Sequence, residues 1–103
     1  MDFPSLHIGE LCARVPIIQG GMGIGISLSS LAGAVAKAGG IGVISAAQPG
    51  YQEEDFFRHS YEANERALGW HLNRAREIAP EGVIGVNVMC RGHHYAEYVK
   101  CAV

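Results

Sequence analysis

The 103-residue chain carries 8 Lys and Arg against 10 Asp and Glu, and this charge of -2 argues against a nucleic-acid partner. Hydrophobic residues make up 49% of the chain, which excludes a disordered protein. Its length suffices for one small domain. No apolar run reaches the roughly 20 residues that span a bilayer, and no signal peptide is recognisable at the start, so we expect no membrane partner. Cys12, Cys90 and Cys101 form no Cys-x-x-Cys pair, so we expect reduced thiols in a cytoplasmic protein.

The first predicted strand is the apolar run 15–19, which stops abruptly in the glycine-rich loop 20–27. Pro16 lies near its start, where the missing N–H is tolerated. Before it, a turn is expected at Ile8-Gly9. The residues expected to cover the bottom of the sheet are Leu11, Cys12 and Val15.

A helix is predicted over about 29–38, with Ser27 or Ser29 as its cap and Gly39-Gly40 as its end. The second strand, 41–44, follows at once, and 45–51 is expected to be a loop because Pro49-Gly50 is a turn signal. The apolar stripe of the helix consists of Leu28, Leu31, Ala32, Val35 and Ala38.

A second helix is predicted over about 53–79, with a break early on, and Glu62–Arg66 is expected to support it as an i,i+4 pair. The third strand is 83–89, and a third helix begins near His94 or Tyr95. The core-facing stripe of the second helix consists of Phe57, Tyr61, Asn64, Leu68, Leu72, Ala75 and Ala79.

The resulting order, β-α-β-α-β-α, predicts an α/β protein whose strands are parallel and joined by helical crossovers. Two architectures remain open at this point, a doubly wound sheet and the opening part of a (β/α)8 barrel. A barrel typically needs about 250 residues, so this chain would supply only the first three βα units.

The loop 20–27 fits neither common phosphate-binding motif. A Rossmann fingerprint starting at Gly21 and Gly23 would need a third glycine where Ile26 stands, and Ser45 occupies the region expected to be acidic. A Walker loop is excluded because no Gly-Lys-Ser/Thr is present. Two interpretations remain, a bare backbone lying against a flat cofactor or a tight turn packed under the helix, and spacing does not decide between them.

Three blocks of sequence carry a resemblance: Pro-Ile-Ile-Gln-Gly-Gly-Met-Gly at 16–23, Leu-Ala-Gly-Ala-Val-Ala-Lys-Ala-Gly-Gly-Ile-Gly at 31–42, and Gly-Val-Asn-Val-Met at 85–89. Together they resemble the nitronate monooxygenase family, formerly called 2-nitropropane dioxygenase, which includes FMN-dependent enoyl-acyl-carrier-protein reductases. The resemblance implies an FMN-binding TIM-barrel oxidoreductase. Residues 1–103 would then be a single partial barrel domain from the amino-terminal part of such an enzyme.

The resemblance also implies which residues contact the flavin. The loop residues Gly20, Gly21, Met22 and Gly23 and the strand residue Asn87 match the family's cofactor-binding positions. A thioether can lie against the ring face, and an amide can donate and accept at its edge. Met22 could equally fill core space, whereas Asn87 inside an apolar strand needs a polar partner.

Two further polar residues near strand ends, Gln19 and Ser45, are weaker candidates for the same rim. Cys90, His93 and His94 are expected to form a polar loop rather than a metal site, because nothing nearby completes a zinc ligand set. No catalytic residue is assigned; the resemblance places it downstream of Val103.

The expected function is therefore FMN-dependent oxidation of alkyl nitronates with oxygen, by an enzyme of which this chain is an incomplete and by itself inactive part. The alternative is an enoyl-acyl-carrier-protein reductase using NAD(P)H, and both alternatives take a small-molecule substrate. A non-catalytic fragment that assembles with another chain, or with itself through open strand edges, is a third alternative.

Overall fold

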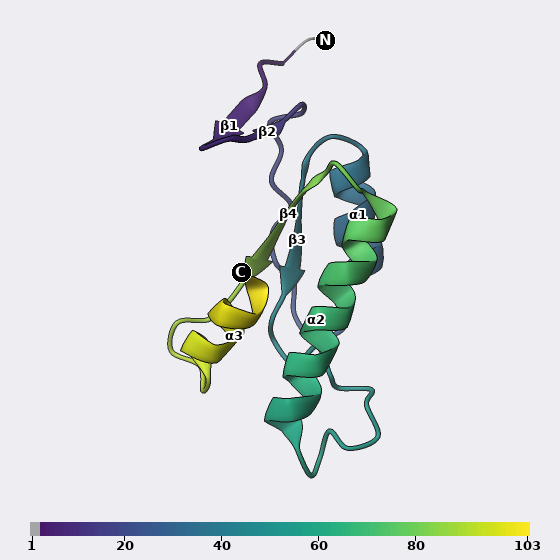
Figure 1. Cartoon of the computed structure of the whole chain (residues 1–103), viewed down its shortest axis with the longest axis vertical. Helices are drawn as coiled ribbons and strands as arrows, with labels where there is room; N and C mark the ends of the chain where they lie inside the picture. Colours follow the sequence, from purple (N-terminus) through teal and green to yellow (C-terminus); the bar gives the residue numbers. More distant parts are fainter. Residues whose placement is uncertain (1–2) are drawn as a thin grey trace.

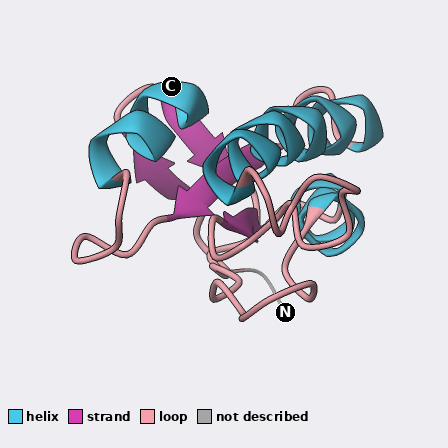
Figure 2. Cartoon of the chain, turned by 90° about the horizontal axis from the view of Figure 1, so that it is seen from below, coloured by secondary structure: helices cyan, strands magenta, loops and turns pink. Residues whose placement is uncertain are grey.

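The computed structural model describes residues 3–103 and shows a small α/β arrangement with helices packed beside a parallel sheet (Figure 1). Its elements, in chain order, are β1 (Leu6–Ile8), β2 (Leu11–Ala13), α1 (Ser29–Lys37), β3 (Ile41–Ser45), α2 (Ser60–Ile78), β4 (Val83–Asn87) and α3 (Tyr95–Ala102). Seen along the long axis, the three helices gather on one side of the strands and most loops on the other (Figure 2). Among residues 3–103, no helix combines the length and hydropathy needed to cross a bilayer.

The parallel pairing predicted from the alternation of strands and helices is confirmed. Strands β3 and β4 run side by side from Ile41 opposite Val83 to Ser45 opposite Asn87. Both strands are five residues long, so their carboxyl ends lie at the same edge of the sheet. Loops that leave this edge are therefore brought together, as ligand-binding loops are in α/β proteins.

The strand predicted at 15–19 is wrong in extent, because only Ile18 forms a bridge, parallel to Ile41 of β3. Two backbone hydrogen bonds flank the bridge, from Ile41 N to Ile17 O at 2.9 Å and from Gln19 N to Ile41 O at 3.0 Å. Pro16 has no N–H to contribute on one side. On the other side the chain turns away into the glycine loop, so the segment keeps its parallel direction but not the expected length.

An antiparallel hairpin, β1–β2, precedes this segment and was not predicted beyond its turn near Gly9. Its strands have three residues each, too few to show an alternating pattern. Leu11 and Cys12 are exposed, contrary to the prediction. Ala13 packs instead against Ile41 and Val83, so the hairpin covers the amino-terminal end of the sheet.

The predicted end of α1 is confirmed, since Gly39 has φ +104° and its N–H donates to Ala36 O. The predicted cap is wrong. Leu28 occupies the N-cap position, and neither Ser27 nor Ser29 makes a capping bond from its side chain. The stripe is confirmed at Ala32, which is fully buried, whereas Ala38 is exposed.

Helix α2 begins at Ser60, seven residues later than about 53 as predicted. The segment before it is folded into turns and held by Arg66, whose guanidinium lies 2.7 Å from Asp55 and 3.7 Å from Glu53. Arg66 therefore pairs with this segment and not with Glu62. Phe57, expected on the buried stripe, is 95% exposed.

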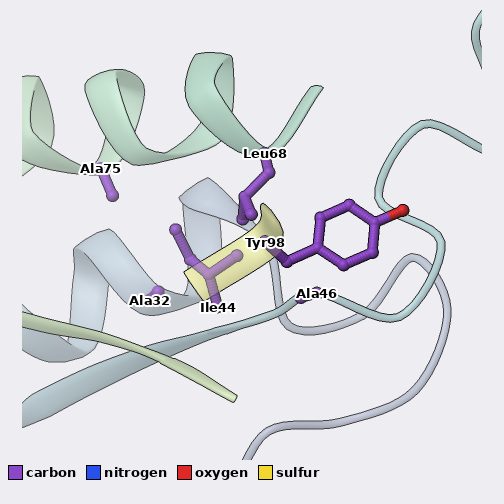
Figure 3. Packing of buried hydrophobic residues seen from close by; sticks show 6 residues of the cluster. All are labelled: Ala32, Ile44, Ala46, Leu68, Ala75 and Tyr98. Atoms are coloured by element: carbon purple, nitrogen blue, oxygen red, sulfur yellow. The ribbon is translucent and has the colours of Figure 1, made fainter. Parts of the chain in front are cut away.

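The core lies between the sheet and the helices, and its largest fully buried side chains are Ile44 of β3 and Leu68 of α2 (Figure 3). The remaining members are mostly small, which lets the helices approach the sheet closely. The buried cluster consists of Ala32, Ile44, Ala46, Leu68, Ala75 and Tyr98. Leu68 confirms the stripe predicted for the second helix, and Ile44 confirms that the second strand is buried.

We expect Leu68→Ala to lower the free energy of unfolding by about 2–5 kcal/mol, because it leaves a cavity between α2 and β3. The measurement is urea denaturation followed by far-UV circular dichroism. Leu11→Ala is the matched control, since Leu11 is 54% exposed and its truncation should change stability by only about 0.5 kcal/mol. Equal losses in the two variants would contradict the assigned core.

Candidate functional site

The loop 20–27 leaves the sheet after Gln19 and returns to it before α1. Gly20, Gly21, Met22 and Gly23 are all exposed. Within the described part of the chain, no N–H of residues 20–26 donates to another protein group. The loop therefore presents a row of backbone donors at the carboxyl edge of the sheet, where a ligand could accept from them.

The base of this loop is closed by the carboxamide of Gln19. Its Oε1 accepts from Val43 N at 3.2 Å, and its Nε2 donates to Val43 O at 3.0 Å. In a regular parallel ladder, the carbonyl of Gln19 and the N–H of Gly21 would take these places. The side chain thus substitutes for a peptide group, which allows the backbone to leave the sheet two residues early.

Ser27 ties the returning end of the loop to the same point. Its hydroxyl accepts from Gln19 Nε2 and donates to Val43 O, and its carbonyl accepts from Ser45 N at 2.8 Å. Ser27 is fully buried, so these bonds are shielded from water. Gln19 was a candidate for the rim of the site. Its carboxamide is instead directed to Val43 and Ser27, where it closes the base of the loop.

Gly21 and Asn87 are brought into direct contact. A Cβ built on Gly21 would lie 2.6 Å from Asn87 Cβ and 3.2 Å from its Oδ1, so the loop backbone lies against this side chain. Asn87 ends β4 and is exposed, and its carboxamide makes no hydrogen bond within residues 3–103. The argument that Asn87 must find a partner inside an apolar strand is thus wrong, because water reaches it at the strand end.

The other candidate residues differ in their surroundings. Met22 is 40% exposed, which removes the alternative that it fills core space. A Cβ on Gly20 or Gly23 would meet nothing within 4 Å, so internal packing does not require glycine at either position. Ser45 is buried, and its Oγ accepts from Ala47 N at 3.2 Å, so it does not face the rim.

The family model for nitronate monooxygenase matches residues 5–67. The chain belongs to the nitronate monooxygenase family. The matched range contains the glycine loop, α1, β3 and the first part of α2. Asn87 lies outside it, so the role of this residue stays a prediction. A comparison with curated proteins finds no match.

Membership of the nitronate monooxygenase family identifies the chain, at the level of the family, as an oxidoreductase. It confirms the resemblance on two of the three sequence blocks, since both 16–23 and 31–42 lie within the match. The hairpin β1–β2 also lies within it, although the resemblance was drawn from Val15 onward.

Two residues that lie beside this loop or the helix start that follows it, Tyr51 and His71, were missed. The hydroxyl of Tyr51 would lie 2.7 Å from a Cβ on Gly25, so the ring packs beneath the second half of the loop. His71 of α2 reaches Ser29, two residues beyond the loop. Tyr51 could have been found as an aromatic residue following a strand end, whereas no local pattern relates His71 to Ser29, 42 residues away.

A second feature of the carboxyl edge is a cavity of about 420 Å³ between α2 and α3. Tyr61 and His94 stack across it with ring centroids 4.0 Å apart. Burial, with a smaller contribution from Glu65, raises the pKa of Tyr61 to about 12, so this phenol stays protonated at neutral pH. His93 and His94 lie in the β4–α3 loop as predicted, and no group of three metal-ligating side chains occurs within residues 3–103.

We expect Gly21→Ala to lower the free energy of unfolding by about 1–3 kcal/mol, because its Cβ would overlap the side chain of Asn87. Gly20→Ala is the control, since its Cβ enters open space. The comparison is made by urea denaturation. If the two variants were equally stable, the contact between loop and strand would be absent in solution.

We expect Gln19→Ala to cost about 1–3 kcal/mol, because it leaves the N–H and carbonyl of Val43 and the hydroxyl of Ser27 without their partner. Thermal and urea unfolding measure the loss. Gln52→Ala serves as the control, since Gln52 is an exposed glutamine outside the loop. A Gln19→Ala variant as stable as this control would refute the assigned role of the carboxamide.

Proposed function

We propose that the chain forms one wall of an FMN pocket in an oxidoreductase that oxidises alkyl nitronates with oxygen. The observation that carries the proposal is the contact of Gly21 with Asn87 at the common carboxyl edge of the sheet. It joins the exposed N–H groups of the loop and a free carboxamide into one polar surface. Membership of the nitronate monooxygenase family supports the choice of reaction.

The residues at this surface fit a flavin. The isoalloxazine ring is flat and apolar on its faces and has polar nitrogen and oxygen atoms along its edge. Open space over Gly20 and Gly23 lets a ring approach the bare backbone, and the half-exposed Met22 thioether can lie against its face. The carboxamide of Asn87 can donate and accept at the edge.

When bound, FMN supplies the electron acceptor that nitronate oxidation requires. The residues of the loop and Asn87 would bind and orient the FMN, but none of them has a side chain that titrates near neutral pH. They cannot therefore take up or release the protons of a reaction. We place the catalytic group outside this surface, and we expect the isolated chain to be inactive even where it binds the cofactor.

We also propose that β3, β4 and their helices are consecutive units of a (β/α)8 barrel. The helices pack on one side of the parallel sheet, whereas Ile18 and Met89 at the strand ends remain more than half exposed. Parallel sheets are normally covered on both faces, and closure into a barrel supplies that cover. The three unpaired cysteines support a reducing compartment such as the cytoplasm as the location.

We expect Asn87→Ala to weaken FMN binding by the 103-residue chain about tenfold, the equivalent of one lost hydrogen bond to a polar ring atom. Quenching of flavin fluorescence on titration gives the affinity. Asn73→Ala is the matched control, since Asn73 is an exposed asparagine on α2, and it should bind FMN like the parent chain.

Gly20→Ala and Gly23→Ala sharpen this test, because both should keep the stability of the parent chain yet bind FMN more weakly. The proposal would be refuted if the folded parent chain bound no FMN at concentrations up to about 1 mM, or if all four variants bound it equally. Turnover of a nitronate is assayed separately, and none is expected from this chain.

A further inference from the structure

The start of α1 is held by a residue from another helix. Ser29 is the first residue of α1, and its N–H is one of the groups that a helix cannot satisfy internally. Ser29 is buried, so water does not take the place of a cap. Instead, Nδ1 of His71 lies 3.3 Å from Ser29 N and 2.9 Å from Ser29 Oγ.

The hydrogen bond from the N–H of Ser29 requires an unprotonated Nδ1. The N–H of Ser29 can only donate, so Nδ1 must accept from it, and the imidazole is then neutral with its proton on Nε2. Protonation of Nδ1 would break the bond from the N–H of Ser29 and leave only the contact with Ser29 Oγ, in which the hydroxyl would then accept. It would also place a positive charge at the amino-terminal end of α1, where the helix dipole opposes it.

The surroundings of His71 add to this preference. Burial lowers the pKa of His71, and the carboxylate of Glu53 partly opposes that effect. Arg74, one turn away on α2, pairs with Glu77 at 3.1 Å, and the rings of Trp70 and His71 are perpendicular with their centroids 4.9 Å apart. The charged residue of α1, Lys37, lies at the opposite end of that helix.

Ser29 is directly connected to the closed base of the glycine loop. Leu28 alone separates it from Ser27, whose hydroxyl and carbonyl are bonded to Gln19, Val43 and Ser45. If Ser29 loses its partner, the first turn of α1 is free to fray, and the returning end of the loop is anchored from one side only. We infer that His71 is a positioning residue for the loop 20–27: its neutral imidazole orders the loop, and its protonation loosens the loop and weakens FMN binding there.

The effect on FMN binding rests on the proposed function, whereas the effect of His71 on the order of the loop does not. Because the pKa of His71 is lowered on folding, the stabilisation is complete above about pH 6.5 and is lost as the pH falls through the lower folded value. We therefore expect FMN affinity to fall about fivefold between pH 7.5 and pH 5, beyond any change in a His71→Asn variant.

The distinguishing variant is His71→Asn, whose Oδ1 can accept from Ser29 but does not titrate. The order of the loop is followed without FMN, through the ¹H–¹⁵N NMR signals of Ser29 and residues 20–27 from pH 7.5 to pH 5. In the parent chain these signals should shift with a midpoint below 6.5. In His71→Asn these signals should keep, at every pH, the chemical shifts they have at pH 7.5. In His71→Ala they should differ from those of the parent chain at pH 7.5 throughout the titration.

His7→Asn is the matched control, since it removes an exposed histidine of the hairpin and should leave the titration unchanged. Circular dichroism at each pH establishes that the chain remains folded. The inference is overturned if the loop signals of the parent chain do not titrate, or if His71→Asn titrates like the parent. Absence of FMN binding at all pH values with a normal NMR titration would refute the proposed function alone.

Discussion

The substitution of a side chain for a peptide group is the constraint on which the candidate site depends. Gln19 continues the ladder to Val43 with its carboxamide, at the point where the backbone has already left the sheet. A backbone that completed this ladder itself would direct the N–H of Gly21 into the sheet. Because the side chain takes that place, the base of the loop stays closed while the N–H groups of residues 20–26 find no acceptor within residues 3–103.

The loop is held at its ends and free between them. Gln19 and Ser27 close the base, and His71 secures the first turn of the helix that follows. Between these points, Gly21 lies against Asn87 and Gly25 against Tyr51. A Cβ built on Gly20 or Gly23 would have no atom within 4 Å. The loop is therefore fixed at both ends while the backbone at Gly20 and Gly23 stays uncovered.

The errors made from sequence have a common origin. The local periodicity predicts a helix from about residue 53. In the structure Asp55 pairs with Arg66, the segment before Ser60 forms turns, and the helix starts at Ser60. Serines near the start of α1 are good caps by type, yet an imidazole from α2 satisfies the first N–H. Ser45 has a polar side chain near a strand end, but its hydroxyl is taken by Ala47. In each case a partner distant in sequence, or a competing local bond, decided the outcome.

The sequence by itself determined the alternation of strands and helices, the parallel pairing of β3 with β4, the end of α1 at Gly39 and the family, because these follow from hydrophobic period, glycine positions and motif order. Only the tertiary structure decided that Gln19 faces inward, that Gly21 meets Asn87 and that His71 caps α1. Periodicity reports which face of an element is buried. It carries no information on which polar atom lies opposite which, since that depends on how elements far apart in the chain are packed.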